Sequence, residues 1–281
     1  MTANVVSPSA EPLLRVRELR KHYAPHGNFW RKRHKIAAVD GVDLEIPAGK
    51  TLALVGSSGS GKSTVARCVT RLERPDAGQV FVAGTDIAML RSRELRPFRS
   101  KIQLVFQDPT TAMNPRFSAA EVVEEPMLIA SLDDKTRRRG RVCALMAEVG
   151  LSPDWENRLV SNFSGGQKQR LAIARALAVQ PKLLVLDEAL SGLDLATQSQ
   201  IANLLRDVQA MHSLTYLLIS HDLSLVSSMA DLVAVIVNGR IAEQGSTEQV
   251  LSNPQHPATR ALLASAQTSA SNLRAAMGVA G

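Results

Sequence analysis

The stretch VGSSGSGKST, residues 55–64, constrains the fold of this chain more than any other segment. It fits the pattern G-x-x-x-x-G-K-[ST], follows the apolar run TLALV and precedes a helical pattern. Glycines let the backbone bend so that successive N–H groups converge on phosphate oxygens, and the start of the helix adds a favourable dipole. A merely flexible Gly/Ser turn would not need the strand, the Lys-Ser pair and the helix. We therefore interpret this stretch as a phosphate-binding loop.

This loop predicts binding of ATP with Mg²⁺. The expected nucleotide-binding residues are Gly56, Ser57, Ser58, Gly59, Ser60, Gly61, Lys62, Ser63 and Thr64. Lys62 is expected to reach the β- and γ-phosphates, and the Ser63 hydroxyl to hold Mg²⁺. The helix that follows is expected to bury one face, formed by Val65, Ala66, Val69 and Leu72.

The hydrophobic pattern predicts an α/β fold. The solid apolar runs TLALV, KLLVLD and TYLLIS are separated by helical patterns, as in a parallel sheet that is buried on both faces. LLRVREL and VDLEI instead alternate apolar with polar residues, which is typical of antiparallel strands. Asn238-Gly239 between two apolar runs predicts a type I′ hairpin. We expect a P-loop NTPase with a mostly parallel core sheet, an N-terminal antiparallel β subdomain and an inserted helical subdomain over residues 108–162.

Length and composition support a folded chain. Its 281 residues, 45% of them hydrophobic, are enough for one large or two modest domains. No apolar run approaches the roughly 20 residues that cross a bilayer, and the first residues lack the features of a signal peptide. We expect a cytosolic chain whose membrane role comes through a partner. Cys68 and Cys143 are too few and too far apart to predict a disulfide framework or a metal site.

The net charge of +7 fits nucleic acid, an anionic membrane face or a phosphorylated ligand, and does not choose among them. Its densest runs are RKRHK (31–35) and RRRGR (137–141), and such runs are most often solvated faces. Because no nucleic-acid-reading module accompanies the charge, we expect no direct binding of nucleic acid. The role of the run at 31–35 stays open.

Two acidic residues end the apolar run LLVLD. Asp187 at the strand end can hold the Mg²⁺ shell, and Glu188 directly after it can polarise an attacking water. Without a phosphate loop this would be an ordinary acidic strand end. With the loop, the two motifs predict a nucleotide hydrolase.

The stretch NFSGGQKQRLAIARAL, residues 162–177, predicts a second helix start that can bind phosphate. Ser164, Gly165, Gly166 and Gln167 lie at its beginning. The expected buried face of the helix consists of Leu171, Ala174 and Ala178, and Pro181 ends the helix. One nucleotide cannot easily touch both loops within one monomer. We therefore expect two subunits head to tail, each offering this loop to the γ-phosphate of its partner.

In this combination the chain resembles the ABC transporter ATPase family over nearly its whole length. The family's motifs follow in order: phosphate loop Gly56 to Ser63, Gln107 in LVFQDP, the signature Phe163 to Gln167, Asp187 with Glu188, Asp194 in SGLD, and His221 after TYLLIS. Two departures are Gly192, where alanine is usual, and Phe163, where leucine is commoner.

The resemblance implies roles for these residues. Ser164, Gly165, Gly166 and Gln167 would contact the ATP of the partner subunit, and His221 the γ-phosphate. Gln107 would link metal and water to a membrane partner, as a third contributor to the Mg²⁺ site beside Ser63 and Asp187. Asp194 would belong to the nucleotide site. The alternative for His221 is a buried structural histidine.

The same resemblance implies an aromatic residue under adenine. Tyr23, near the end of the first strand, matches best, although His22, Phe29 and Trp30 are close in sequence. Face-to-face stacking would discriminate little between ATP and GTP. The alternative is an ordinary strand-end aromatic.

Two further stretches, FQDPTTAMNPRFS and NPQHPATRALLASA, are similar to the ATPase subunits of bacterial peptide and nickel importers. Ala112-Met113 and Ala258 depart from that pattern. The likeness implies uptake of di- or oligopeptides, with nickel, a metallophore or an opine as alternative cargo. A soluble ABC ATPase acting on nucleic acid is the other alternative.

That likeness also implies an assembly. Its parts would be a second, different ATPase subunit, two transmembrane permeases and, indirectly, an extracytoplasmic substrate-binding protein, with this chain peripheral on the cytoplasmic face of the inner membrane. No cysteine follows Cys143, so we expect no iron–sulfur site. The expected division is an N-terminal extension over 1–12, an ABC ATPase domain over 13–252, and a C-terminal extension and tail over 253–281.

Overall fold

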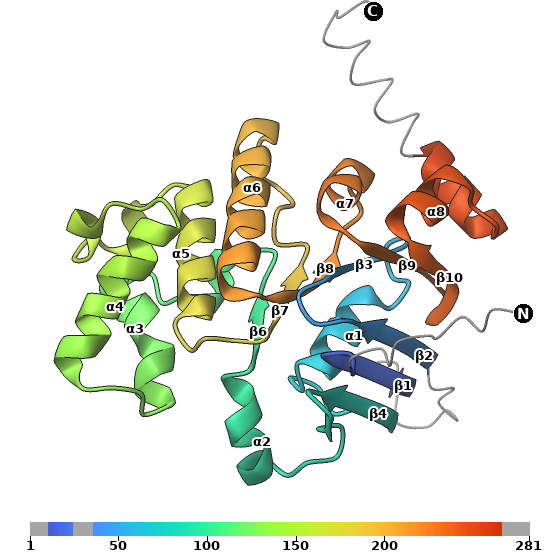
Figure 1. The fold of residues 1–281 in the computed structure, drawn as a ribbon, viewed down its shortest axis with the longest axis horizontal. Helices are drawn as coiled ribbons and strands as arrows, with labels where there is room; N and C mark the ends of the chain where they lie inside the picture. Colours follow the sequence, from blue (N-terminus) through green and yellow to red (C-terminus); the bar gives the residue numbers. More distant parts are fainter. Residues whose placement is uncertain (1–10, 25–35, 266–281) are drawn as a thin grey trace, which may run out of the picture.

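The computed structural model describes residues 11–24 and 36–265 (Figure 1). The residues outside this description include Phe29, Trp30, the basic run 31–35, most of the expected extension 1–12 and residues 266–281 of the expected C-terminal extension and tail. The strands are β1 (Leu14–Tyr23), β2 (Ile36–Ile46), β3 (Thr51–Val55), β4 (Ala77–Val82), β5 (Thr85–Asp86), β6 (Ile102–Val105), β7 (Leu183–Asp187), β8 (Thr215–Ile219), β9 (Leu232–Val237) and β10 (Arg240–Ser246).

Helices occupy the segments between most of these strands. The α-helices are α1 (Lys62–Val69), α2 (Ser92–Arg99), α3 (Ala119–Ile129), α4 (Lys135–Glu148), α5 (Gly165–Leu177), α6 (Leu195–His212), α7 (Leu223–Met229) and α8 (Thr247–Ser252). Short 3₁₀ turns are η1 (Pro109–Ala112), η2 (Pro153–Trp155) and η3 (Val160–Asn162). No helix in the described part of the chain is long and apolar enough to cross a membrane.

The core sheet has the strand order β10-β9-β3-β8-β7-β6, and the pairings among its last five strands are parallel. Successive residues of β3 point to opposite faces: Ala53 joins a hydrophobic cluster with α3 to α7, whereas Leu52 and Leu54 join a second cluster with α1 and the other sheet. Both faces are therefore buried, and the predicted α/β fold with a mostly parallel sheet is confirmed.

The second sheet is antiparallel, with the order β2-β1-β4-β5. It confirms the expected N-terminal β subdomain, because β1 pairs with β2 from Leu14 opposite Ile46 to Tyr23 opposite Ile36. The strand β4 on the other side of β1 was not predicted. Its sequence AGQVFV brings only Val80 and Val82 to the buried face, so its periodic signal is short.

The helix after the phosphate loop differs from the prediction at its end. Val65, Ala66 and Val69 are buried as predicted, but α1 ends at Val69. Arg71 then adopts a left-handed φ of 53°, which turns the chain away from the helix axis. Leu72 is consequently 52% exposed, and its place on the buried face was wrongly predicted.

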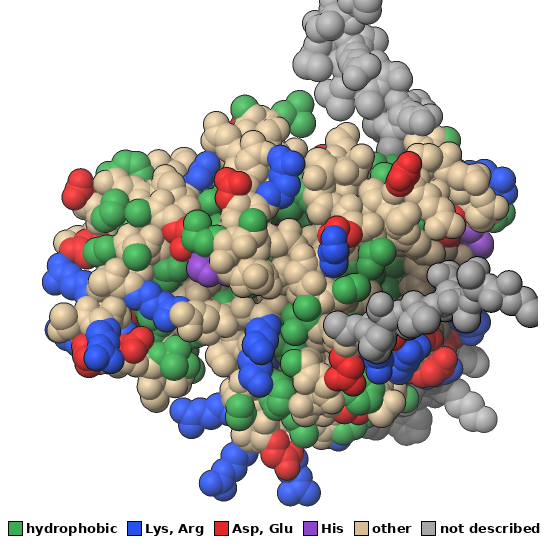
Figure 2. All heavy atoms as spheres, in the orientation of Figure 1, with side chains coloured by type: hydrophobic (Ala, Val, Ile, Leu, Met, Phe, Trp, Pro, Cys, Tyr) green, Lys and Arg blue, Asp and Glu red, His purple; other side chains and the backbone are tan. Residues whose placement is uncertain are grey.

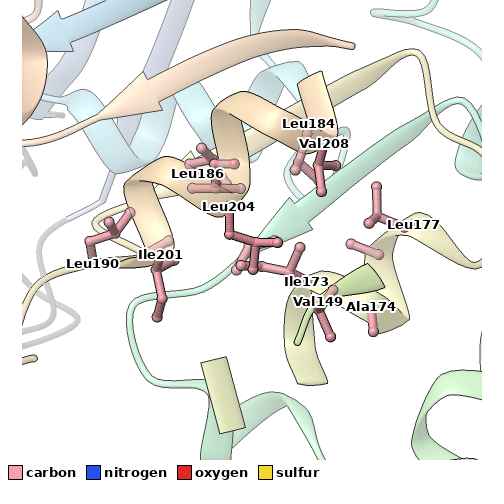
Figure 3. Packing of buried hydrophobic residues seen from close by; sticks show 14 of the residues in the cluster. Val149, Ile173, Ala174, Leu177, Leu184, Leu186, Leu190, Ile201, Leu204 and Val208 are labelled. Carbon is pink, nitrogen blue, oxygen red and sulfur yellow. The ribbon is translucent and has the colours of Figure 1, made fainter. Parts of the chain in front are cut away.

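Helices α3 and α4 lie between β6 and α5, within the segment expected to be helical, and pack beside α5 at the left of Figure 1. Figure 3 shows how α5 meets the core: Ile173, Ala174 and Leu177 project toward apolar side chains of β7 and α6. Leu171, Ala174 and Ala178 are buried as predicted. This packing fixes the start of α5, where the signature sequence lies.

The predicted type I′ hairpin is confirmed between β9 and β10. Asn238 and Gly239 have φ values of 49° and 77°, the positive pair that this turn requires. A Cβ atom on Gly239 would lie 2.8 Å from the carbonyl oxygen of Ala38 in β2. The glycine therefore also allows the two sheets to approach each other.

Candidate functional site

The loop from Gly56 to Thr64 connects β3 to α1, and two of its glycines, Gly56 and Gly61, leave no space for a side chain. A Cβ atom on Gly56 would lie 2.3 Å from the carbonyl oxygen of Ile236, and one on Gly61 would lie 2.3 Å from that of Ala38. Gly61 also has a φ of 109°, which residues with a side chain rarely adopt. The tight packing holds the loop against β2 and β9, so its backbone is preformed.

The start of α1 is left open by its own side chains. Gly61 is the N-cap and makes no side-chain capping hydrogen bond. The Ser60 hydroxyl is buried and has no hydrogen-bond partner among the described residues. The first N–H groups of a helix need external acceptors, and they favour anions. This helix start can therefore receive an anion.

The Lys62 ammonium group lies over the loop. It donates hydrogen bonds to the carbonyl oxygens of Gly56 at 2.9 Å and Ser57 at 2.8 Å. Burial lowers the pKa of Lys62, and the nearby carboxylates of Glu188 and Asp187 oppose that shift. A buried ammonium held by two carbonyls is positioned to bind an anion bound in the loop.

Ser63 and Asp187 meet although 124 positions separate them in the sequence. The Ser63 hydroxyl donates to the Asp187 carboxylate at 3.0 Å. Burial raises the pKa of Asp187, while this hydrogen bond lowers it. A hydroxyl and a carboxylate are the hard oxygen ligands that Mg²⁺ prefers. The pair therefore fits a magnesium ion beside a phosphate loop.

Glu188 follows β7 in a conformation that non-glycine residues seldom adopt, with a φ of 50°. Its backbone N–H donates to the carbonyl oxygen of Ile219 at 3.0 Å, which ties it to the end of β8. His221 Nδ1 lies 3.8 Å from Glu188 Oε2, and both residues line a cavity of about 90 Å³ with Ser191 and Ser220. The His221 side chain is 63% exposed, so the alternative of a buried structural histidine is wrong.

We call Lys62, Ser63, Asp187, Glu188 and His221 the phosphate-loop cluster. Its members come from the carboxyl ends of three adjacent parallel strands, β3, β7 and β8, and from the loops after them. Ligands of open α/β sheets bind outside the carboxyl ends of the strands. The arrangement combines an anion-binding loop, oxygen ligands for a divalent cation and a carboxylate that can accept a proton.

Tyr23 lies next to α1, and neither hydrophobic core cluster of the described residues includes it. Its hydroxyl donates to the Glu73 carboxylate, and Glu73 is also bound by Arg67 of α1 at 3.3 Å. Burial and the bond to Glu73 raise the pKa of Tyr23. Glu73 belongs to no sequence motif and meets Tyr23 only through the fold, so the sequence gives no signal for its position at the site.

The signature sequence forms a second cluster at the start of α5. The Ser164 hydroxyl accepts the N–H of Gln167 at 3.3 Å, and the Gln167 side chain accepts the N–H of Ser164 at 3.0 Å. A Cβ atom on Gly166 would lie 2.6 Å from Cγ2 of Thr197. Thr197 in turn bonds Asp194, the N-cap of α6, with 2.9 Å from its N–H to the carboxylate. We call Ser164 to Gln167 with Asp194 the signature cluster.

The residue that opens the signature, Phe163, is buried between two neighbours. The Trp155 ring meets it edge to face at 6.1 Å, and the Arg158 guanidinium lies 4.9 Å from its ring centroid. Arg158 also lies 5.3 Å from the Trp155 ring. These contacts fix the backbone just before Ser164, and they were not predicted from the sequence.

Gln107 follows β6, the strand beside β7, and its side chain is exposed. Within residues 11–24 and 36–265 this side chain has no hydrogen-bond partner. The structure therefore puts Gln107 at the same edge of the sheet as Asp187 but does not bring it into contact with the phosphate-loop cluster.

Known proteins share both the sequence and the fold. The family model described as ABC transporter matches residues 39–191. The dipeptide transport ATP-binding protein DppF of Haemophilus influenzae is 42% identical over 263 residues, which cover 94% of this chain and 80% of the relative. The di/tripeptide transport ATP-binding protein DppF of Pseudomonas aeruginosa is 42% identical over 253 residues, covering 90% and 78%.

Solved structures of ABC ATPases have the same fold as this chain. The ATP-binding cassette MJ0796, in a dimeric post-hydrolysis state bound to ADP and Pi, superposes with a TM-score of 0.74 at 28% identity, covering 83% of this chain and 98% of that one. CbiO1 of Clostridium perfringens, part of the ABC transporter complex cbiONQ, superposes with a TM-score of 0.75 at 28% identity, covering 87% and 92%. The chain therefore belongs to the ABC transporter family, and it is a nucleotide-binding ATPase of that family.

Proposed function

We propose that this chain is the ATP-binding and ATP-hydrolysing subunit of an ABC importer that takes up di- or oligopeptides. The observation that carries the proposal is the phosphate-loop cluster, in a chain 42% identical to dipeptide transport ATP-binding proteins. A putative peptide import ATP-binding protein of Brucella ovis is 44% identical over 252 residues and supports the same cargo class.

The residues present fit ATP with Mg²⁺. The buried Ser60 hydroxyl without a partner and the uncapped start of α1 both suit phosphate oxygens. Ser63 and Asp187 supply oxygen ligands for the metal, with Gln107 as a third candidate ligand. When bound, Mg²⁺ would neutralise phosphate charge and orient the terminal phosphate.

Each member of the phosphate-loop cluster then has a chemical task. Lys62 binds the β- and γ-phosphates, and the loop from Gly56 to Thr64 cradles them. Glu188 orients the attacking water and accepts its proton, and His221, 3.8 Å away, contacts the γ-phosphate. Tyr23 supports the adenine ring.

The signature cluster serves a different nucleotide in this proposal. Ser164, Gly165, Gly166 and Gln167 face the ATP of a second subunit in a head-to-tail dimer, and Asp194 lies beside them at that interface. The contact of Gly166 with Thr197, which bonds Asp194, supports treating the two motifs as one surface. The second subunit is a different ATPase chain, as in the peptide-importer subgroup.

The proposed importer function implies a transport assembly. The dimer acts under two permeases at the cytoplasmic face of the inner membrane and receives cargo indirectly from an extracytoplasmic binding protein. Residues 13–252 form the ATPase domain with a helical subdomain over 108–162, and residues 253–281 form the C-terminal extension. The matched region 39–191 and the helices α3 and α4 support this division.

The cargo is tested by uptake of a labelled dipeptide and of labelled nickel in cells that carry the wild-type chain or Glu188→Gln. The ATPase does not touch the cargo, so only uptake can separate these classes. We expect the variant to abolish dipeptide uptake and to leave nickel uptake unchanged. Loss of nickel uptake alone would reassign the cargo, and persistence of both in a strain without redundant importers would contradict the importer role for these two cargoes.

A further inference from the structure

The helices α4 and α2 are both rich in arginine, but within the described part of the chain only the arginines of α4, and not those of α2, form ion pairs with carboxylates. In α4, Arg138 pairs with Glu124 at 2.7 Å, Arg139 with Glu156 at 2.5 Å, and Arg137 with Asp134 at 3.6 Å. The basic run RRRGR, residues 137–141, is therefore largely neutralised by carboxylates from α3 and the neighbouring loops.

Helix α2 has the opposite arrangement. Arg91, Arg93, Arg96 and Arg99 are exposed, and within the described residues no ion pair joins any of them to a carboxylate. Glu94, the acidic residue of the helix, accepts the backbone N–H of Arg91 at 2.8 Å and so serves as part of the helix cap. Glu94 keeps its negative charge in this cap, so α2 and Arg91 together carry four positive charges against one negative charge, with no ion pair between them.

Neighbouring arginines add to this charge. The Arg99 guanidinium bonds the carbonyl oxygens of Thr70 and Arg71, both at 3.1 Å, and carbonyl partners leave its full charge in place. Burial lowers the pKa of Arg71, and the charges of Arg74 and Arg99 lower it further, so these three cations lie close enough to repel one another. Figure 2 shows Lys and Arg side chains projecting along the lower edge of the molecule, where Figure 1 places α2.

An exposed apolar side chain belongs to the same surface. Met89, which is 43% exposed, lies just before α2, and its sulfur is 3.5 Å from Nη2 of Arg74. On the inner side, Leu95 is buried and Phe98 packs against the core, which holds the helix with its arginines outward. A rigid surface that combines basic and apolar side chains suits the boundary between lipid headgroups and acyl chains.

We propose that the α2 surface, formed by Arg74, Met89, Arg91, Arg93, Arg96 and Arg99, binds directly to anionic phospholipids of a bilayer. This goes beyond the proposed function, in which the chain reaches the membrane only through permeases. Charge complementarity selects the ligand, because the surface has several cations without protein counter-ions and phospholipid phosphates supply the missing anions. The exposed thioether favours a bilayer over nucleic acid, which offers no apolar layer.

The test is co-sedimentation of the full-length chain with vesicles of phosphatidylcholine alone or mixed with phosphatidylglycerol, at low and at high salt. The variant Arg93→Glu/Arg96→Glu removes exposed charges of the α2 surface. The control Arg137→Glu/Arg206→Glu changes the net charge equally, at exposed positions on α4 and α6. Thermal unfolding and nucleotide binding of all three proteins establish that each is folded.

We expect wild type and control to bind phosphatidylglycerol vesicles alike at low salt, and the α2 variant to bind roughly tenfold or more weakly. High salt should release the wild type. Equal loss in both variants would show a general charge effect and overturn the proposal. Absence of wild-type binding, or equal binding to neutral vesicles, would overturn it too. Because no permease, cargo or hydrolysis takes part, the result is independent of the proposed transport function.

Discussion

The helices α1 and α5 both begin at glycine-rich loops proposed to bind phosphate, but the two starts are built differently. The start of α1 has no side-chain cap, is packed against β2 and β9, and carries the buried ammonium of Lys62. The start of α5 is capped within the chain by Ser164 and Gln167, and it is exposed. The first N–H groups of α1 therefore lack a side-chain acceptor and can bind an anion, whereas the start of α5 already has side-chain hydrogen bonds within the chain. This difference fits the proposal that the chain binds its own nucleotide at α1 and offers α5 to the nucleotide of a second subunit.

The largest expected effect is on the chemistry beside α1. Glu188→Gln keeps the shape of the side chain but removes the carboxylate that accepts a proton, so the hydrolysis rate should fall by about 10²–10⁴-fold. ATP affinity should be unchanged by titration calorimetry. Glu248→Gln, at an exposed position in α8, is the control and should hydrolyse ATP normally. Rapid turnover in Glu188→Gln would remove Glu188 from the proposed mechanism.

Lys62→Ala tests binding at the same helix start. Loss of a buried ammonium that can bind phosphate oxygens should weaken ATP binding by about 100-fold, since a hydrogen bond to a charged group contributes roughly 1.5–3 kcal/mol. The measurement is the Kd for ATP of the isolated chain. Lys50→Ala removes a lysine that pairs with Asp231 at the surface and should leave the Kd unchanged. An unchanged Kd in Lys62→Ala would contradict the site.

Ser164→Ala tests whether α5 serves a second nucleotide. Removal of an N-cap should cost about 1 kcal/mol of unfolding free energy. It should leave the Kd for ATP of the isolated chain unchanged and lower the turnover of the assembled dimer by about tenfold, which corresponds to one lost hydrogen bond to a charged phosphate.

The matched control for Ser164→Ala is Ser118→Ala, because Ser118 forms the same type of capping box at the start of α3. Ser118→Ala should lose similar stability and keep full turnover. If Ser164→Ala instead weakened ATP binding by the isolated chain as strongly as Lys62→Ala does, both loops would serve one nucleotide and the comparison would fail.

Tyr23→Ala tests how much stacking of the base contributes to nucleotide affinity, in addition to the phosphate contacts at α1. Loss of a stacked ring should weaken ATP and GTP binding alike, each by roughly tenfold. Tyr23→Phe keeps the ring but loses the bond to Glu73, so an intermediate loss would show that Glu73 orients the ring. Selective loss of ATP over GTP binding would indicate edge recognition of the base instead of stacking.

The smallest expected effect is on stability. Burial raises the pKa of Asp187 above its ordinary 3.8, so the folded chain holds this proton more tightly than the unfolded chain does. As pH rises from 3.8 through the raised pKa, the folded chain therefore loses stability, and Asp187→Asn escapes that loss. We expect the thermal midpoint of Asp187→Asn to exceed that of wild type by a few degrees at pH 7 and by less near pH 4. A difference in thermal midpoint that stayed constant from pH 4 to pH 7 would contradict the coupling between protonation of Asp187 and stability.

Local sequence determined much of the site. The phosphate loop, the acidic end of LLVLD and the Ser-Gly-Gly-Gln start of α5 are contiguous stretches whose backbone chemistry is set by their own residues. The α/β class was equally predictable, because strands buried on both faces need solid apolar runs. The hairpin at Asn238-Gly239 needed only the positive φ angles that these two residues accept.

Features that depend on contacts between distant segments of the chain could not be predicted from the sequence. Leu72 satisfies the helical spacing, but the left-handed turn at Arg71 ended the helix before it. Glu73 carries no motif, and its role at Tyr23 comes from a contact across 50 positions. The sequence also did not show which arginines would find carboxylate partners: three arginines of α4 form ion pairs, whereas the arginines of α2 form none among the described residues.

The sequence by itself determined which chemical groups this protein has and which short stretches can hold phosphate, because those properties depend on residues next to one another. Only the tertiary structure decided that Ser63 meets Asp187, that Glu188 meets His221, and that the starts of α5 and α6 pack together. The physical reason is that parallel strands pair residues far apart in the chain and bring their carboxyl ends to one edge, where separate motifs become a single site.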